Sequence, residues 1–490
     1  MTLKLHNTLT KRVDEFTPIS DNTVTLYTCG PTVYDYPLIG NWTAYIYWDI
    51  LVRTLIADGY TVDRVMNITD VGHLTSDEDE GQDKLEKGAQ REGKTAWDIA
   101  NFYTEDFLQG MKALGMIMPE HITRATDYIP QQLELIRTLK KKGYTYQIDD
   151  GIYFDTSKFP TYADFAGLDL AAQRAGARVA FNEEKRNLSD FALWKFTPKG
   201  EKRDMEWETP ADLLETKPTQ PVMGFPGWHL ECSAMAMNIL GETIDIHTGG
   251  IDHIPVHHTN EIAQSEAASG QTFAHYWVHN NHIKVNGTKI SKSLNNGYTL
   301  QDLEERGFTA LDYRMFVLQG QYSNEGNFTF ENLEAAANRL HHWRNIAALR
   351  WQTYDTIADD NDKTVTLIAT SSAIIEALND NLNTPEALSS IDQAFGIFDS
   401  KALTTIHQYG LSQLLETIDA TLGLQLLKTT PDIDDATKQL ILERQRAREE
   451  KNWEKSDELR EKIKRSGIVI KDVDGGQSVW EYVALERKID

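Results

Sequence analysis

A strand–helix–strand pattern near the N-terminus is the feature that most constrains the fold. Residues 23–29 have the composition of a buried strand and end at Gly30-Pro31. Apolar residues at helical spacing follow over residues 41–58, and residues 61–68 again have strand composition. This order is typical of a doubly wound parallel sheet, in which ligands bind beyond the carboxyl ends of the strands. The sequence therefore predicts an α/β, Rossmann-like domain with its ligand site between Cys29 and Asn41.

The remainder of the chain indicates further units, because 490 residues exceed what one hydrophobic core supports. Short strands and proline-containing loops fill residues 145–225, and strand patterns return at residues 243–247, 276–278 and 283–285. Beyond residue 300 the pattern is helical almost to the end, with a linker near residues 428–435. We predict five segments: the first half of the Rossmann-like domain (1–145), an insertion (146–225), the second half (226–300), a helical stem and bundle (301–428) and a small C-terminal region (429–490).

Composition excludes several classes of protein. Two cysteines rule out a disulfide framework and fit a reducing cytoplasm. The sequence has no run of eighteen apolar residues, so we expect no membrane span. Residues 1–7 lack an apolar run, so we expect no secretory signal. The net charge of −25 argues against general nucleic-acid binding, but residues 438–471 hold eleven Lys/Arg against seven Asp/Glu. That local excess suits directed contact with a polyanion, and it equally suits a solvated helix with many ion pairs.

Two segments have the chemistry to bind phosphate. Lys289-Ile290-Ser291-Lys292-Ser293 follows a hairpin signal at residues 285–288 and places two ammonium groups on a loop. Gly40 and Asn41 open the first predicted helix, whose N-terminus would favour an anionic group. Each segment alone is equally compatible with an ordinary solvated loop or a simple strand–helix turn.

Four residues have the chemistry of a zinc site. His257 and Glu261 are four positions apart and so share one face of a predicted helix, over about residues 255–268. Cys29 ends a predicted strand, and Cys232 lies early in an apolar helix. Two thiolates, an imidazole and a carboxylate suit Zn²⁺. From the residues alone, however, both cysteines are more simply explained as core residues.

Several motifs together resemble the class I aminoacyl-tRNA synthetases, and most closely the cysteinyl-tRNA synthetase family. They are Tyr27-Thr28-Cys29-Gly30-Pro31-Thr32-Val33-Tyr34-Asp35, Asn67-Ile68-Thr69-Asp70-Val71, Gly227-Trp228-His229-Leu230-Glu231-Cys232-Ser233-Ala234-Met235, His257-His258-Thr259-Asn260-Glu261-Ile262-Ala263-Gln264 and the Lys289–Ser293 loop. Weaker similarity continues through residues 383–388 and 453–457, so the resemblance spans nearly the whole chain.

The resemblance implies a cysteine–tRNA ligase that activates L-cysteine with ATP and Mg²⁺ and transfers it to the terminal adenosine of tRNA(Cys). It assigns one Zn²⁺ per chain to Cys29, Cys232, His257 and Glu261, where it would select the cysteine thiolate over serine without an editing domain. The remaining site residues that we predict are Lys292 and Lys289 for catalysis, Lys292, Gly40, Asn41 and Asp252 for ATP, and Trp228 and Thr32 for the amino acid. Trp228 is equally well explained as an ordinary core aromatic. It also implies a monomer whose residues 429–490 bind the anticodon.

One position departs from the family pattern. Members usually have a histidine just before Ile-Gly-Asn, and this chain has Leu38, which cannot donate a hydrogen bond to phosphate. Two alternatives therefore stay open beside the ligase. One is an ATP-dependent enzyme that joins cysteine to a small amine. The other is a catalytically impaired relative that binds tRNA or nucleotide.

Overall fold

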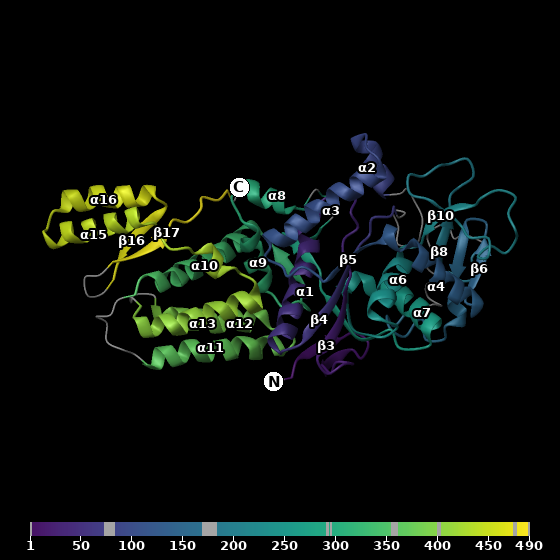
Figure 1. Ribbon diagram of the computed structural model, residues 1–490, viewed down its shortest axis with the longest axis horizontal. Helices are drawn as coiled ribbons and strands as arrows, with labels where there is room; N and C mark the ends of the chain where they lie inside the picture. The colour runs from purple at the N-terminus through teal and green to yellow at the C-terminus, as the bar shows by residue number, and fades with distance from the viewer. Residues whose placement is uncertain are drawn as a thin grey trace.

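The computed structural model describes residues 2–72, 84–168, 184–290, 294, 296–353, 361–398, 403–473 and 478–488. The molecule is elongated, with an α/β region at one end and helices at the other (Figure 1). Lys292, Ser291 and Ser293 of the predicted phosphate loop lie outside the described residues.

A parallel sheet forms the centre of the α/β region. Its strand order is β12 (Ala274–Asn280), β11 (Ile244–Gly250), β3 (Thr23–Thr28), β4 (Thr61–Ile68) and β5 (His121–Arg124), and all neighbours run parallel. The chain leaves β3 towards β4 and β5 on one side and later adds β11 and β12 on the other. The order therefore switches between β3 and β11, which is where open α/β sheets bind ligands. The predicted α/β fold is confirmed.

Helices cover this sheet. α1 (Ile39–Ala57) joins β3 to β4 and is buried nearly all round, with Trp48, Ile50 and Leu51 completely inaccessible. Such a helix forms because packing on several sides stabilises it. α2 (Lys84–Glu92) and α3 (Ala96–Ala113) precede β5, and α4 (Ile129–Lys141) follows it. α6 (Trp228–Leu240) and α7 (Thr259–Ser269) flank β11 in the sequence and pack against each other and against α4.

The insertion forms a separate antiparallel sheet. Its order is β6 (Thr145–Ile148), β7 (Gly151–Phe154), β8 (Phe191–Phe196), β10 (Met223–Pro226) and β9 (Trp207–Glu208). A second short antiparallel pair, β1 (Lys4–Asn7) and β2 (Arg12–Glu15), lies at the N-terminus and contacts β12.

The hairpin signal before the phosphate loop is confirmed. β13 (Ile283–Val285) pairs with β14 (Thr288–Lys289) across Asn286 and Gly287, whose φ angles of 49° and 74° fit a type I′ turn. β15 (Gly326–Phe328) then pairs in parallel with β13. The prediction of a helical pattern beyond residue 300 misses this strand, which is too short to show alternation.

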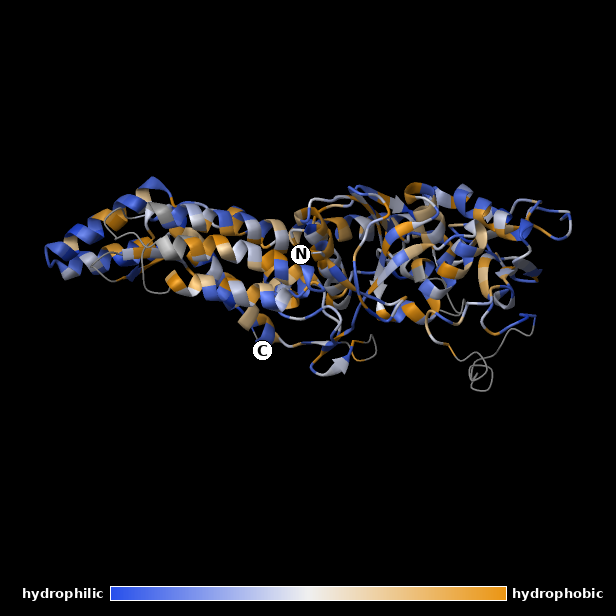
Figure 2. Ribbon diagram, turned by 90° about the horizontal axis from the view of Figure 1, so that it is seen from below, coloured by the Kyte–Doolittle hydropathy of each residue, from blue (hydrophilic) through white to orange (hydrophobic). Residues whose placement is uncertain are grey.

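The C-terminal part is helical with a small terminal hairpin. The helices are α8 (Leu300–Glu305), α9 (Ala310–Leu318), α10 (Phe330–Ala348), α11 (Asn361–Asn379), α12 (Thr384–Phe395), α13 (Thr405–Leu422), α14 (Leu426–Thr429), α15 (Asp435–Glu449) and α16 (Trp453–Arg465). The chain ends in β16 (Ile468–Asp472) and β17 (Ser478–Tyr482), so the helical pattern runs almost to the end, as predicted, and stops at Arg465. Figure 2 shows that α15 and α16, at the far left, are mainly hydrophilic.

A buried ionic cluster joins the sheet domain to the helices. Asp49 of α1 pairs with Arg53 at 2.7 Å and with Arg314 of α9 at 2.5 Å. Arg53 and Arg314 also donate to carbonyl oxygens at the C-terminal ends of α13 and α3. Cations at these helix ends satisfy carbonyl groups that lack partners within the helix.

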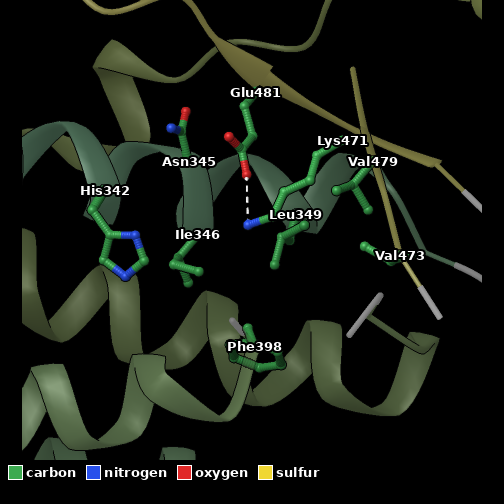
Figure 3. Close-up of a pocket in the computed structure, with 9 residues that line it drawn as sticks. All are labelled: His342, Asn345, Ile346, Leu349, Phe398, Lys471, Val473, Val479 and Glu481. Carbon is green, nitrogen blue, oxygen red and sulfur yellow. Dashed lines mark ion pairs between the residues drawn. The ribbon is translucent and has the colours of Figure 1, made fainter. Parts of the chain in front are cut away.

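The terminal hairpin docks on the end of the helical part. Gln352 donates from Nε2 to the Trp480 carbonyl at 3.0 Å and accepts from the Trp480 N–H at 2.7 Å. Beside this joint, a small pocket lies between α10 and the hairpin, and a Lys471–Glu481 ion pair of 3.4 Å joins the two hairpin strands on one of its walls (Figure 3). This pocket lies far from the residues predicted to bind metal and nucleotide.

Candidate active site

The structure brings the four predicted metal ligands together. Single donor atoms of Cys29, Cys232, His257 and Glu261 lie within 4.8 Å of one another, and all four side chains are buried. Cys29 directly follows β3, Cys232 lies in the second turn of α6, and Glu261 belongs to α7. The cluster therefore lies at the carboxyl end of β3, beside the switch point of the sheet.

Gly30 fixes Cys29 at this position. Its N–H donates to Asn67 Oδ1 at 2.8 Å, and a Cβ at Gly30 would overlap the Asn67 carbonyl oxygen. Only glycine permits this close approach of the chain to β4. The chain stays close to the end of β4 over the next residues, since Thr32 forms an isolated parallel β-bridge with Thr69. Thr32 is partly exposed three residues after Cys29, and its contact with the amino acid stays a prediction.

The helix predicted over residues 255–268 differs at its start. Residues 254–258 form a π-helical turn, and α7 begins at Thr259. His257 Nε2 nevertheless lies 2.9 Å from Glu261 Oε1. Among the described residues, Oε1 receives no hydrogen bond of good geometry despite its complete burial. A nitrogen and an oxygen this close together without a well-aligned hydrogen bond fit two ligands of one metal ion, and π turns are frequent at functional sites.

The charges of the cluster are strongly coupled. The hydrogen bond from Cys29, together with His257, lowers the pKa of the Cys232 thiol to about 7. The hydrogen bond to Cys232 and burial raise the pKa of the Cys29 thiol far above its ordinary value. Although burial opposes it, Glu261 raises the pKa of His257 to about 10. Burial also opposes ionisation of Glu261, but His247 and His257 hold the pKa of its carboxyl well below the ordinary value. The arrangement thus favours the anionic forms of Cys232 and Glu261, which are the forms that bind zinc, while Cys29 keeps its proton as the donor to Cys232.

A shell of histidines surrounds the cluster, and the sequence reasoning missed it. His258 Nε2 lies 3.4 Å from Cys29 Sγ, His247 Nε2 lies 2.9 Å from Glu261 Oε2, and His229 Nδ1 lies 2.9 Å from His257 Nδ1. Burial lowers the pKa of His258 far below its ordinary value, so this ring is neutral at pH 7. A signal was present, because His247 is the last residue of the strand predicted at residues 243–247.

The predicted nucleotide residues lie at the start of α1. The Leu38 N–H donates to Asn41 Oδ1 at 3.0 Å, and the Ile39 N–H donates to the Tyr298 carbonyl at 2.8 Å. A Cβ at Gly40 would lie 3.3 Å from Ile290 Cδ1, so Gly40 faces the phosphate loop. Lys289 is exposed at the end of β14, and Lys292 lies outside the described residues. The structure therefore places one end of the loop against the helix start.

Two further predicted residues lie at the edges of the cluster. Asp252 is exposed just beyond the carboxyl end of β11, where a ribose could reach it. Trp228 opens α6, and its ring centroid is 4.6 Å from that of His257. Its partly exposed ring can therefore form one wall of a pocket beside the four ligands.

Comparison with known proteins identifies the family. Residues 15–338 match the tRNA synthetases class I (C) catalytic domain, and residues 430–479 match the cysteinyl-tRNA ligase anticodon binding domain. The cysteine–tRNA ligase of Treponema denticola is 40% identical over 507 residues, covering 98% of this chain and all of that protein. The chain belongs to the cysteine–tRNA ligase family. Cysteine–tRNA ligase 1 of Burkholderia lata, 41% identical over 485 residues, covers 98% of this chain and 97% of its own length.

Solved structures of other synthetases share the fold of this cysteine–tRNA ligase family member. Methionyl-tRNA synthetase of Mycobacterium tuberculosis, in complex with methionyl-adenylate, superposes with a TM-score of 0.55 at 16% identity, covering 84% of this chain and 91% of that chain. The LeuRS of Agrobacterium radiobacter K84, in a ternary complex with tRNA, superposes with a TM-score of 0.57 at 12% identity. That match covers 86% of this chain and 88% of that chain. In the described parts of the chain, no helix combines the length and apolar character that a membrane span requires.

Proposed function

We propose that this protein is a cytoplasmic, monomeric cysteine–tRNA ligase. It joins L-cysteine to ATP as cysteinyl-adenylate with release of pyrophosphate, and then transfers the cysteinyl group to the terminal adenosine of tRNA(Cys). The observation that carries the proposal is the convergence of four buried donor atoms from Cys29, Cys232, His257 and Glu261 at the switch point of the sheet. The relatives that match along almost the whole chain are cysteine–tRNA ligases.

The donor set fits zinc. Two sulfurs, one nitrogen and one oxygen are its usual ligands, and the buried Glu261 Oε1 has no well-aligned partner among the described residues. When bound, zinc supplies a Lewis acid that takes up a thiolate strongly and a neutral hydroxyl poorly. Cysteine differs from serine by this one atom, which a pocket reading shape alone discriminates poorly.

The other residues have roles in orientation and charge. Trp228 and Thr32 border the place of the amino acid, and Asp252 accepts hydrogen bonds from the ribose. Gly40 and Asn41 frame the nucleotide at the N-terminus of α1. Lys289 and Lys292 carry positive charge towards the triphosphate, with Mg²⁺ sharing that role. Loss of one such electrostatic contact costs about 3 kcal/mol of transition-state stabilisation.

An anticodon-binding region argues against the small-amine alternative. Residues 430–479 match that domain, and a ligase acting on a small amine has no use for it. The local basic excess over residues 438–471 is in the same part of the chain.

Pyrophosphate exchange tests the proposal. We expect cysteine-dependent ATP–pyrophosphate exchange that serine does not support, and that a zinc chelator abolishes and added zinc restores. Charging of tRNA(Cys) but not of another tRNA would support the specificity for tRNA. Bound zinc without exchange at any substrate concentration would instead favour the impaired relative that Leu38 suggests.

A further inference from the structure

A line of hydrogen bonds runs from the N-terminal hairpin to Cys29. Thr8 Oγ1 lies 2.7 Å from His279 Nδ1, and His279 Nε2 lies 2.7 Å from His258 Nδ1. His258 Nε2 then lies 3.4 Å from Cys29 Sγ. Both rings are buried, with 4% of His279 and none of His258 exposed. The line joins residues that are far apart in the sequence.

The first member of this line is held firmly in place. Thr8 follows β1, and its N–H donates to the Trp277 carbonyl at 2.8 Å. The side chain of Asn7 bonds the backbone of β12 twice, from Nδ2 to the His275 carbonyl and from the Trp277 N–H to Oδ1, each at 3.0 Å. These bonds anchor the backbone at Thr8 to β12, and the Thr8 hydroxyl lies beside His279.

The chemistry of the two ends sets the direction of the line. A neutral imidazole has one N–H donor and one acceptor nitrogen, while a hydroxyl can donate or accept. A cysteine that binds a metal is a thiolate and can only accept. The arrangement that satisfies every atom has Thr8 donating to His279 Nδ1, His279 Nε2–H donating to His258 Nδ1, and His258 Nε2–H donating to Cys29.

We infer that Thr8 is a positioning residue that, through His279, holds the N–H of His258 on the Cys29 sulfur. The inference rests on the proposed zinc-dependent function. A hydrogen bond to an anionic sulfur is charge-assisted, so it stabilises the thiolate and disperses its charge. A zinc ion held by these ligands would then be better able to bind the sulfur of an incoming cysteine.

The tautomer of His258 tests this inference directly. Nitrogen-15 labelling of the histidines in the full-length, zinc-loaded protein allows NMR to locate the ring protons. We expect protons on Nε2 of both His258 and His279. A proton on Nδ1 of His258 would overturn the inference whatever the charging activity. Loss of charging with the expected tautomers would instead count against the proposed function alone.

Three variants extend the test. Thr8→Val removes the hydroxyl with little change of shape, and we expect a roughly 10-fold weaker affinity for zinc in chelator competition, together with mixed His279 tautomers. Thr8→Ser should restore both. Thr10→Val is the matched control, because the Thr10 hydroxyl in the same turn donates to Asp14 instead. Equal zinc affinities and unchanged tautomers for Thr8→Val and wild type would overturn the inference.

Discussion

At the scale of single residues, Leu38 is the position where a substitution is most expected to raise the rate of adenylation. Its side chain packs towards Gly297, where a Cβ would come within 2.7 Å of Leu38 Cδ1, and it offers no donor at the start of α1. Leu38→His should raise the rate of cysteine-dependent pyrophosphate exchange roughly 10- to 100-fold, because a donor gains contact with the triphosphate. Leu38→Ala removes the same packing without adding a donor and should not raise the rate. An unchanged or lower rate for Leu38→His would show that this position does not limit catalysis.

The four residues of the metal cluster were predictable from the sequence. The residues that form hydrogen bonds towards them, such as Thr8 and His279, were not. Cys29, Cys232, His257 and Glu261 follow from the resemblance and from ligand chemistry, and the structure places them together. The bond from Thr8 to His279 joins positions 271 residues apart, and no local pattern indicates it. Lys292 stays a prediction, since it lies outside the described residues.

At the scale of elements, the turn after β3 decides where Cys29 lies. Gly30→Ala should lower the free energy of unfolding by about 1–3 kcal/mol and reduce bound zinc, because the new Cβ overlaps the Asn67 carbonyl and displaces the strand end. Denaturant titration and metal analysis measure the two effects. Gly396→Ala is the control, since nothing lies within 4 Å of a Cβ there and its φ of −56° suits any residue. Equal losses in both variants would contradict this role of Gly30.

The sequence predicts the long elements well and the short or irregular ones poorly. β4 matches residues 61–68, and α1 begins only two residues before the predicted start, because strand composition and helical spacing are clear there. The π turn at residues 254–258 and the strand β15 have no such pattern, since tertiary contacts determine both. The domain boundaries at 145, 225, 300 and 428 stay predictions.

At the scale of the whole molecule, Asp49 links α1 to the helical part through its ion pair with Arg314 of α9. Although burial opposes it, Arg314 and Arg53 hold the pKa of Asp49 below its ordinary value. Asp49→Asn should lower the free energy of unfolding by about 3–5 kcal/mol, because two buried guanidinium groups lose their anionic partner and keep only carbonyl acceptors. The half-buried Asp58 at the end of the same helix accepts from an amide, so Asp58→Asn should cost about 1 kcal/mol or less.

The ion pairs of Asp49 with Arg53 and Arg314 also predict how the stability of the protein depends on pH. A carboxylate with a depressed folded-state pKa stabilises the protein above its unfolded value of about 4, and this stabilisation is lost as the pH falls further. The unfolding free energy of the wild type should therefore fall more steeply below about pH 4 than that of Asp49→Asn. Identical slopes in denaturant titrations across this range would show that folding does not lower the pKa of Asp49.

The joint at Gln352 should couple the terminal hairpin to tRNA charging. Gln352→Leu leaves the N–H and carbonyl of Trp480 unpaired, so we expect kcat/KM for tRNA to fall about 10-fold while pyrophosphate exchange without tRNA is unchanged. Gln408→Leu removes a bond to the Arg350 carbonyl within the helical part and serves as the control. A parallel loss of exchange in Gln352→Leu would place the effect in the catalytic domain instead.

A spectroscopic titration of the cobalt-substituted protein tests most directly whether the Cys29, Cys232, His257 and Glu261 cluster selects the substrate by its sulfur. Cobalt(II) in the place of zinc gives absorption bands that report each thiolate ligand. Addition of L-cysteine should increase the sulfur-to-cobalt charge-transfer absorption, and L-serine should leave it unchanged. An equal response to both amino acids, or none to cysteine while the protein still charges it, would contradict the account.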